Sequence, residues 1–323
     1  MIRFYCLMCG YEVGDDLQTF QCPRCGSPLV ARYSIAREQY LRVIYAARNR
    51  RELGVWSFYP LIPVPKTGPS LGEGWTPEVK LERVANNLGL GALIAKNEAA
   101  NPTGTFVDRG AAIDVWWAKL KGFRKIVVPA LGDFAVAAAS YGVKVDIEVL
   151  TILPRDVERG KLYRILLTGA RIELVDNYRR ALERARKIAA VHGFYLSLTH
   201  STMVIEGYRT IVLEIIERLR GGLDYVVMPV GEGVLATAIY KGLQEVQEVL
   251  NLDVPTIILV QLSSIHRTKT MEMDRAGIVE VFRDIIVETP TATNMAMEAL
   301  KRSNGLLSIV DELTVFETAY RVA

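Results

Sequence analysis

The stretch NPTGTFVDRGAAI, residues 101–113, carries the strongest signal in this sequence. Asn-Pro and Thr-Gly at its start are typical of a loop, and Asp108 and Arg109 fall in the first turn of the helix predicted after it. In α/β folds, ligands bind at loops of this kind, between the end of a strand and the start of a helix. Val107 is out of place there, because it is a β-branched hydrophobe between an aromatic residue and two charged ones. The stretch therefore predicts a ligand site in which one position lacks its expected polar residue.

Short β-branched runs alternate with amphipathic helices from about residue 91 onward. Runs that are apolar almost throughout indicate parallel strands that helices cover on both faces. Helical periodicity is clearest over residues 177–193 and 206–222. The predicted strands cover residues 91–98, 125–130, 146–153, 171–176, 194–198, 224–231, 256–262 and 284–289. The fold class is therefore α/β with parallel sheets, and the sequence contains no internal repeat.

Two more loops follow the pattern of the first. The strand at 125–130 turns through Gly132 into a helix of small residues, and the strand at 224–231 turns through Gly233 into another helix. Helix N-termini attract negative charge, because their free amides and the helix dipole both favour it. We expect the three loops to form one ligand cleft.

Four cysteines fall within the first 25 residues, as two C-x2-C pairs. Such pairs supply the tetrahedral set of thiolates that zinc prefers, and Gly10 and Gly26 follow them where a tight turn needs a residue without Cβ. Two disulfides are the alternative, and the absence of a secretion signal argues against them. The predicted ligands of a structural zinc ion are Cys6, Cys9, Cys22 and Cys25. Four cysteine ligands leave no open coordination position on the metal, so its role would be structural rather than catalytic.

Composition excludes several classes of protein. The 323 residues carry a formal net charge of +3, too little to attract nucleic acid through bulk electrostatics. No apolar run approaches the roughly 20 residues that cross a bilayer, and the N-terminus lacks the features of a signal peptide. We therefore expect a cytoplasmic protein that binds neither membrane nor nucleic acid.

Several motifs together resemble threonine synthase, a pyridoxal-phosphate (PLP) enzyme of the tryptophan-synthase β group, or fold type II. The resemblance implies two α/β lobes with the cofactor in the cleft between them, usually in a dimer. The motifs are SLGEGWTP (70–77), AKNEAANPTGTFVDRG (95–110), KLYRILLTGARIELVD (161–176), EGYRTIVLEI (206–215) and PVGEG (229–233). We expect a zinc ribbon at 1–30, a helical connector and extended linker at 31–69, and the two-lobed domain at 70–323. The smaller lobe is expected at roughly 108–204.

The sequence departs from the family pattern at the loops that the resemblance assigns to PLP. Position 107 would be the lysine that forms the Schiff base, and here it is Val107. The loop for the substrate carboxylate would read Ser-Ser-Gly-Asn, and residues 130–133 read Ala-Leu-Gly-Asp. The phosphate loop would read Gly-Asn-x-Gly-Asn, and residues 231–235 read Gly-Glu-Gly-Val-Leu. Lys96 is not an evident replacement, because family members that keep the Schiff-base lysine commonly have a lysine there as well.

The resemblance also implies a helix and a Thr-Gly-rich strand after the strand at 306–311, and that strand would supply the partner of the cofactor ring nitrogen. We expect this part to be shortened, since the sequence ends at Ala323. These losses predict a pseudoenzyme without PLP, either a homodimer or a hetero-oligomer with an active paralogue, that acts as a scaffold or regulator. The degenerate cleft is expected to contain Thr105, Asp108, Gly132, Asp133, Gly231, Glu232 and Gly233.

Two other functions stay open. The first is a threonine-synthase-related lyase or a PLP-independent enzyme in the same cleft. Its histidines would be His192, His200 and His266, of which only His200 follows a strand near the cleft. Asp133 and Glu232 could form a carboxylate pair there, although we expect two solvated loop acids instead. The second is a binding module built on the zinc ribbon.

Overall fold

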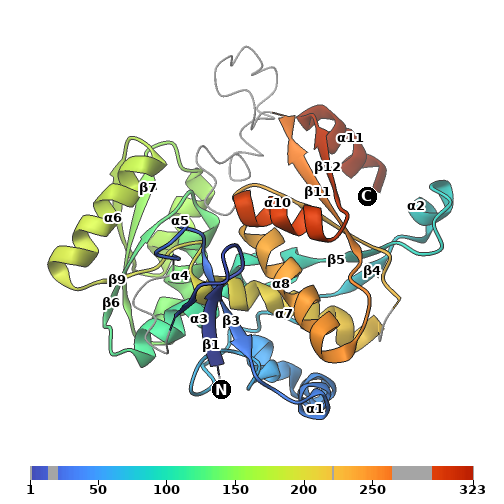
Figure 1. Ribbon diagram of the computed structural model, residues 1–323. Coiled ribbons are helices and arrows are strands. Elements are labelled where there is room, and N and C mark those ends of the chain that lie inside the picture. Colours follow the sequence, from blue (N-terminus) through green and yellow to red (C-terminus); the bar gives the residue numbers. More distant parts are fainter. Residues whose placement is uncertain (1, 14–20, 220–221, 264–292, 323) are drawn as a thin grey trace.

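The computed structural model describes residues 2–13, 21–219, 222–263 and 293–322 (Figure 1). The first of its two main sheets has the strand order β8-β7-β6-β9, with all three pairings parallel. Its strands are β6 (Lys125–Pro129), β7 (Glu148–Pro154), β8 (Arg171–Val175) and β9 (Tyr195–Leu196). The helices around it are α4 (Asp133–Lys144), α5 (Arg159–Leu167) and α6 (Tyr178–His192). This sheet lies within the range expected for the smaller lobe.

The second lobe contains the parallel sheet β10-β11-β12 (Figure 1). Its strands are β10 (Tyr225–Pro229), β11 (Thr256–Leu262) and β12 (Leu306–Val310). Helices α8 (Val234–Leu250) and α10 (Thr293–Arg302) share a hydrophobic core with it, and α11 (Glu312–Val322) follows β12. The strand expected at 284–289 lies outside the described residues. Because the strands of both main sheets pair in parallel and helices pack with these sheets, the predicted α/β class is confirmed.

The strand expected at 91–98 differs from the others. It forms β5 (Ile94–Lys96), which pairs antiparallel with β4 (Glu78–Lys80) in a separate two-stranded sheet. A short helix, α2 (Glu82–Asn87), connects the two. The chain turns back through residues 81–93, so that Glu78 pairs with Lys96 and Lys80 with Ile94.

Two buried helices lie between the lobes, α3 (Val107–Leu120) and α7 (Thr202–Leu219). They pack closely because glycines face each other across the contact. A Cβ on Gly110 would lie 2.7 Å from the ring of Tyr208, and a Cβ on Gly207 would overlap the carbonyl oxygen of Arg109. The close contact fixes the start of α3, where Val107 is, relative to the rest of the molecule.

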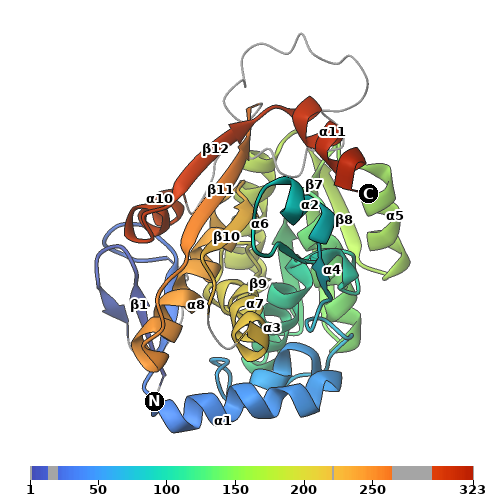
Figure 2. The ribbon, with the colours of Figure 1, turned by 90° about the vertical axis from the view of Figure 1, so that its right-hand side faces the viewer.

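The connector wraps around the second lobe. Helix α1 (Arg37–Ala47) is followed by the 3-10 segment η1 (Arg48–Phe58), and Figure 2 shows α1 running along the base of the molecule. Tyr40, Ile44 and Phe58 are fully buried and join the hydrophobic core of the second lobe. The connector is therefore part of the folded body.

The ribbon consists of β1 (Ile2–Cys6), β2 (Glu12–Val13) and β3 (Leu29–Tyr33), all paired antiparallel. Its sheet continues past residue 30, because Ile2 pairs with Tyr33. Leu29, Val30 and Ala31 are fully buried in the same hydrophobic core as α3 and α4. The ribbon is thus packed against the body of the protein.

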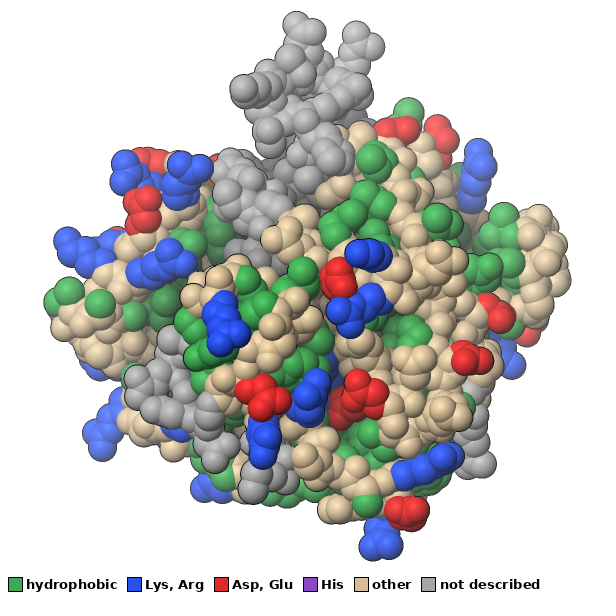
Figure 3. All heavy atoms as spheres, viewed as in Figure 1, with side chains coloured by type: hydrophobic (Ala, Val, Ile, Leu, Met, Phe, Trp, Pro, Cys, Tyr) green, Lys and Arg blue, Asp and Glu red, His purple; other side chains and the backbone are tan. Residues whose placement is uncertain are grey.

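None of the helices within the described residues is long and apolar enough to span a membrane. On the face shown in Figure 3, acidic and basic side chains are intermixed over most of the surface rather than gathered by sign.

Candidate functional site

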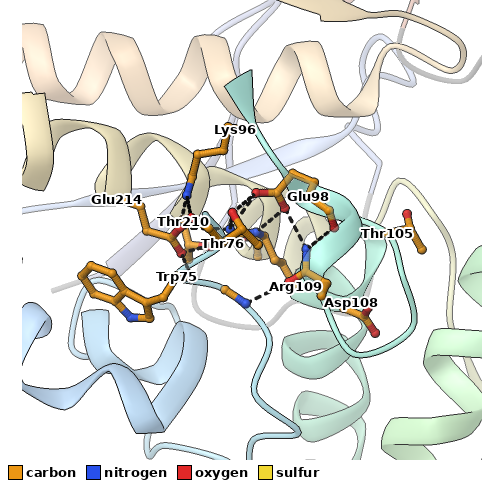
Figure 4. A network of polar contacts seen from close by, with 12 residues as sticks. Trp75, Thr76, Lys96, Glu98, Thr105, Asp108, Arg109, Thr210 and Glu214 are labelled. Atoms are coloured by element: carbon orange, nitrogen blue, oxygen red, sulfur yellow. Dashed lines mark hydrogen bonds and ion pairs between the residues drawn. The ribbon is translucent and has the colours of Figure 1, made fainter. Parts of the chain in front are cut away.

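Arg109 lies at the centre of a buried ion network in the first turn of α3 (Figure 4). Its Nε donates to Glu98 Oε2 at 2.7 Å and its Nη2 donates to Glu98 Oε1 at 2.8 Å. On the other side, Nη1 and Nη2 donate to the two carboxylate oxygens of Glu214 at 2.5 and 3.0 Å. Burial by itself would raise the pKa of Glu214, but the charges of Arg109 and Lys96 outweigh it and lower the pKa. The network fixes α3 to the segment after β5 and to α7.

Lys96 belongs to the same network (Figure 4). Its Nζ lies 2.7 Å from Glu214 Oε2 and donates to the carbonyl oxygen of Thr76 at 2.8 Å. Lys96 does not line the cleft described below. These contacts agree with the expectation that Lys96 is not a replacement for the Schiff-base lysine.

Asp108 shapes the loop that precedes α3. Its Oδ2 accepts hydrogen bonds from the backbone N–H and the hydroxyl of Thr103, at 2.8 and 2.9 Å. Burial raises the pKa of Asp108 to about 6, although the bonds from Thr103 act in the opposite direction. We expected Asp108 in the cleft, but its carboxylate faces the interior of the loop and is not part of the cleft wall.

The expected ligand cleft is present between the lobes. It measures about 200 Å³, and residues from both lobes, α3 and α7 form its wall. Among the described residues, the wall contains no Lys, Arg or His. Its members are residues 105–107, 131–134 and 229–236, with Tyr178, Thr199 and Tyr208. The structure thus brings together the expected Thr105, Val107, Gly132, Asp133, Gly231, Glu232 and Gly233.

The two acids of the cleft have different surroundings. Asp133 Oδ1 lies 3.1 Å from Nζ of Lys161 on α5, an ion pair that the sequence did not predict. Glu232 has no ion pair within the described residues, and desolvation raises the pKa of its carboxyl. Neither is the freely solvated loop acid that we expected.

Tyr178 and Thr199 were also not identified from the sequence. Both line the cleft, and neither the Tyr178 hydroxyl nor the Thr199 hydroxyl has a hydrogen-bond partner within the described residues. Burial raises the pKa of Tyr178, and the charge of Glu232 raises it further. Thr199 lies beside Tyr178 and Glu232, and it lowers the pKa of each in part. The hydroxyls of Thr199 and Tyr178 nevertheless do not meet hydrogen-bond geometry with each other or with Glu232.

The histidines do not form a catalytic group in the described residues. His200 is buried outside the cleft wall, with its Nε2 3.5 Å from Gln21 Nε2, and burial lowers its pKa to about 4. His192 is exposed at the end of α6. His266 lies outside the described residues.

The four cysteines form one cluster. All four Sγ atoms lie within 4.8 Å of one another, with Cys6 and Cys25 at 3.4 Å and Cys9 and Cys22 at 3.5 Å. Zinc–sulfur bonds of about 2.3 Å in a tetrahedron place sulfurs roughly 3.8 Å apart, so the spacing suits zinc. The cysteines are not joined as disulfides. Gly10 and Gly26 have φ angles of 69° and 74°, which agrees with the expected tight turns.

Comparison with known proteins places this fold and cleft in a family. Residues 69–323 match the family of pyridoxal-phosphate dependent enzymes. The chain belongs to this family. Threonine synthase from Methanosarcina acetivorans is 29% identical over 97% of this chain and 79% of that protein. Threonine synthase from Halalkalibacterium halodurans is 31% identical over 78% of this chain and 71% of that protein.

Solved structures with a similar fold agree with this result. Maize serine racemase superimposes with a TM-score of 0.60 at 17% identity, over 75% of this chain and 73% of that one. Diaminopropionate ammonia lyase from Escherichia coli superimposes with a TM-score of 0.55 at 17% identity, over 68% of this chain and 63% of that one. The family match confirms the predicted family, and these superpositions confirm the predicted fold type.

Proposed function

We propose that this threonine-synthase-like protein has lost PLP chemistry and acts as a pseudoenzyme, a scaffold or regulator built on the family fold. Val107 carries the proposal. It begins α3 on the wall of the cleft, at the position where the resemblance implies the lysine that bonds to PLP. The chemistry needs an amine that condenses with an aldehyde and then moves protons at the substrate carbon. An isopropyl group can do neither.

The rest of the cleft wall does not fit the cofactor. PLP carries a phosphate, and the wall offers it no cation within the described residues. Glu232 instead stands beside the helix start where the family binds the phosphate. Like charges about 4 Å apart repel by roughly 4 kcal/mol at an intermediate dielectric. Val234, buried in the first turn of α8, occupies a position where the family has glycine.

The loop before α3 is held by contacts within the protein. Asp108 and Arg109 hold it through Thr103, Glu98 and Glu214, and all of these bonds lie within the protein. A family member that lacks the amine can therefore keep its fold, which supports a non-catalytic role.

Assembly is part of the proposal. We propose a cytoplasmic homodimer, or a hetero-oligomer with an active paralogue. Tyr225 and Val227 are each 59% exposed on β10, and the faces of parallel sheets are normally covered. A scaffold needs such a surface, and light scattering of the purified protein, alone and mixed with a threonine synthase, measures the assembly.

Titration with PLP tests the loss of chemistry. We expect no absorbance change typical of PLP bound to lysine, no label after borohydride reduction, and no threonine from O-phosphohomoserine. A borohydride-stable label on a lysine would overturn the proposal. Lys161 is the first to inspect by peptide mapping, because its ion pair with Asp133 places it beside the cleft. Lys161→Met then shows whether that lysine is the one labelled.

A further inference from the structure

We propose that the cleft binds a small organic cation, a primary amine on an apolar body, with the amine held by Glu232, Tyr178 and Thr199. The inference rests on the proposed function, because it requires a cleft that PLP does not fill. It assigns to the cleft a ligand of the opposite charge to the phosphate and carboxylate groups that the family fold handles.

Unsatisfied polar atoms mark the place of the amine. Tyr178 is only 6% exposed, and its hydroxyl has no hydrogen-bond partner within the described residues. The Thr199 hydroxyl beside it is likewise unpartnered. Buried polar groups without partners are rare in folded proteins and cost free energy, so such a pair indicates a missing ligand or water. Glu232 completes the group from the other lobe, as an acceptor without an ion-pair partner within the described residues.

The charge of the missing group follows from the carboxylates around the cleft. Tyr208 lies in the cleft wall, and its pKa reports the local potential. Burial raises this pKa most, and four negative charges raise it further, those of Glu232, Asp114, Asp108 and Asp133. A further anion near these carboxyl groups is disfavoured, whereas an ammonium group is attracted.

Helix ends do not reverse this preference. The helices α3, α4 and α8 all begin at the cleft, and each start contributes about half a positive elementary charge. Asp108 and Asp133 lie in the first turns of α3 and α4, and Glu232 precedes α8 by two residues. The partial positive charge of each helix N-terminus is therefore opposed by the carboxylate of a nearby residue of the same chain. Lys161 lies 3.1 Å from Asp133 and 3.6 Å from Glu158, so its charge is shared between these two acids.

The remaining wall selects an apolar body of limited size. The apolar side chains that line the cleft include Phe106, Val107, Leu131, Phe134, Val230 and Leu235. A volume of about 200 Å³ is below the roughly 300 Å³ at which pockets for drug-sized ligands begin. A ligand with one ring and a short aminoalkyl chain matches both the volume of the cleft and its apolar lining.

Three probes of similar shape test the charge preference: benzylamine, benzyl alcohol and phenylacetate. Their affinities for the PLP-free protein are measured by calorimetry or by ligand-observed NMR. We expect benzylamine to bind at least about tenfold more tightly than benzyl alcohol, because a charge-assisted hydrogen bond is roughly twice as strong as a neutral one. Phenylacetate should bind more weakly than both. Equal or tighter binding of the alcohol or the acid would overturn the inference, as would no amine binding at about 10 mM.

Two pairs of variants locate the site. Glu232→Gln keeps the shape and removes the charge, so benzylamine should lose about tenfold in affinity and benzyl alcohol should change by less than about threefold. Glu317→Gln, on exposed α11, is the matched control. Tyr178→Phe should weaken benzylamine by a few fold, and Tyr163→Phe, at a position 60% exposed, should not. An amine preference that persists in Glu232→Gln would show that this site is not responsible.

The outcome is separable from that of the PLP titration. A borohydride-stable PLP label would remove the proposed function whatever the probes do. A PLP-negative protein that binds phenylacetate best would leave the proposed function standing and remove the inference alone.

Discussion

The hydroxyl of Tyr33 donates a 2.8 Å hydrogen bond to Oε2 of Glu206, and this bond joins the last strand of the cysteine ribbon to the central helix α7. Glu206 is fully buried and also accepts the N–H of Ala31 at 3.0 Å. Arg209 at 2.8 Å and Lys241 at 3.0 Å balance its charge. The ribbon is therefore anchored in the ion network that holds α7 and α8 together.

Removal of the metal should consequently destabilise the whole protein. Metal analysis should find one zinc per chain. Stripping it with a chelator should lower the main melting temperature by roughly 5 °C or more, since metal binding and folding are coupled. Zinc added back should restore the value, and chelator already saturated with zinc is the control. An unchanged main transition would mean that the ribbon unfolds independently, and a metal-free ribbon with disulfides would contradict the zinc site.

The contact between α3 and α7 should not tolerate a side chain. Gly207→Ala places a Cβ against the carbonyl oxygen of Arg109, which is rigid helix backbone, so we expect a loss of about 2 to 3 kcal/mol in the free energy of unfolding. Gly160→Ala on α5 is the matched control, because its Cβ would meet only the flexible side chain of Glu158 at 3.3 Å. Because alanine has a higher helix propensity than glycine, Gly160→Ala should increase the free energy of unfolding by up to about 1 kcal/mol. Urea unfolding measures both, and equal effects would refute the close contact.

Asp114 should oppose folding as the pH rises. It accepts hydrogen bonds from Tyr195, Ser197 and Ser201, yet burial outweighs them and raises its pKa from 3.8 to about 6. The folded protein holds this proton more tightly than the unfolded chain. Its contribution to stability is therefore largest below pH 3.8 and declines by about 3 kcal/mol as the pH rises through 6.

Asp114→Asn tests this, because an amide stays neutral. The free energy of unfolding of the variant, relative to the natural protein, should improve steadily from pH 4 to pH 7. Asp146→Asn, the same substitution at a fully exposed position, is the control. A flat difference for Asp114→Asn would show that the carboxyl has an ordinary pKa.

Restoring the amine alone should not restore the family chemistry. In Val107→Lys the new ammonium would be close to Asp133 or Glu232, and such a pair keeps it protonated rather than nucleophilic. We expect no threonine synthesis from this variant. Weak PLP binding should appear only when Asp133→Asn, Glu232→Asn and Val234→Gly are added, measured by absorbance. High turnover by Val107→Lys alone would mean that the cofactor site is intact and would remove the pseudoenzyme proposal.

Local signals in the sequence predicted much of the fold. Helix α6 was expected at 177–193 and is found at 178–192, because both of its ends carry their own signals. The side chain of Asn177 accepts the N–H of Arg180 at 3.0 Å, and Gly193 ends the helix in the left-handed conformation. The antiparallel pairing of β5 was missed, since a short apolar run does not reveal its partner.

The cleft was predicted only in part. Its three loops follow from the strand–loop–helix pattern, whereas Tyr178 and Thr199 join the site through the packing of separate elements. Nothing beside Tyr178 in the sequence distinguishes it from any aromatic residue at the start of a helix. The desolvation of Glu232 likewise depends on atoms from both lobes. Such properties arise only when the chain is folded.

The first turn of α3 gives adjacent residues unrelated tasks. Val107 faces the cleft, while Asp108 and Arg109 face inward and hold the loop. A change at position 107 alters what the protein can react with and leaves its architecture in place, whereas a change one or two residues later breaks the architecture itself. Under the proposed loss of PLP chemistry, a single mutational step at position 107 would remove the reactive amine and leave these contacts in place. A cleft without PLP could then evolve toward other ligands while the contacts of Asp108 and Arg109 hold the loop.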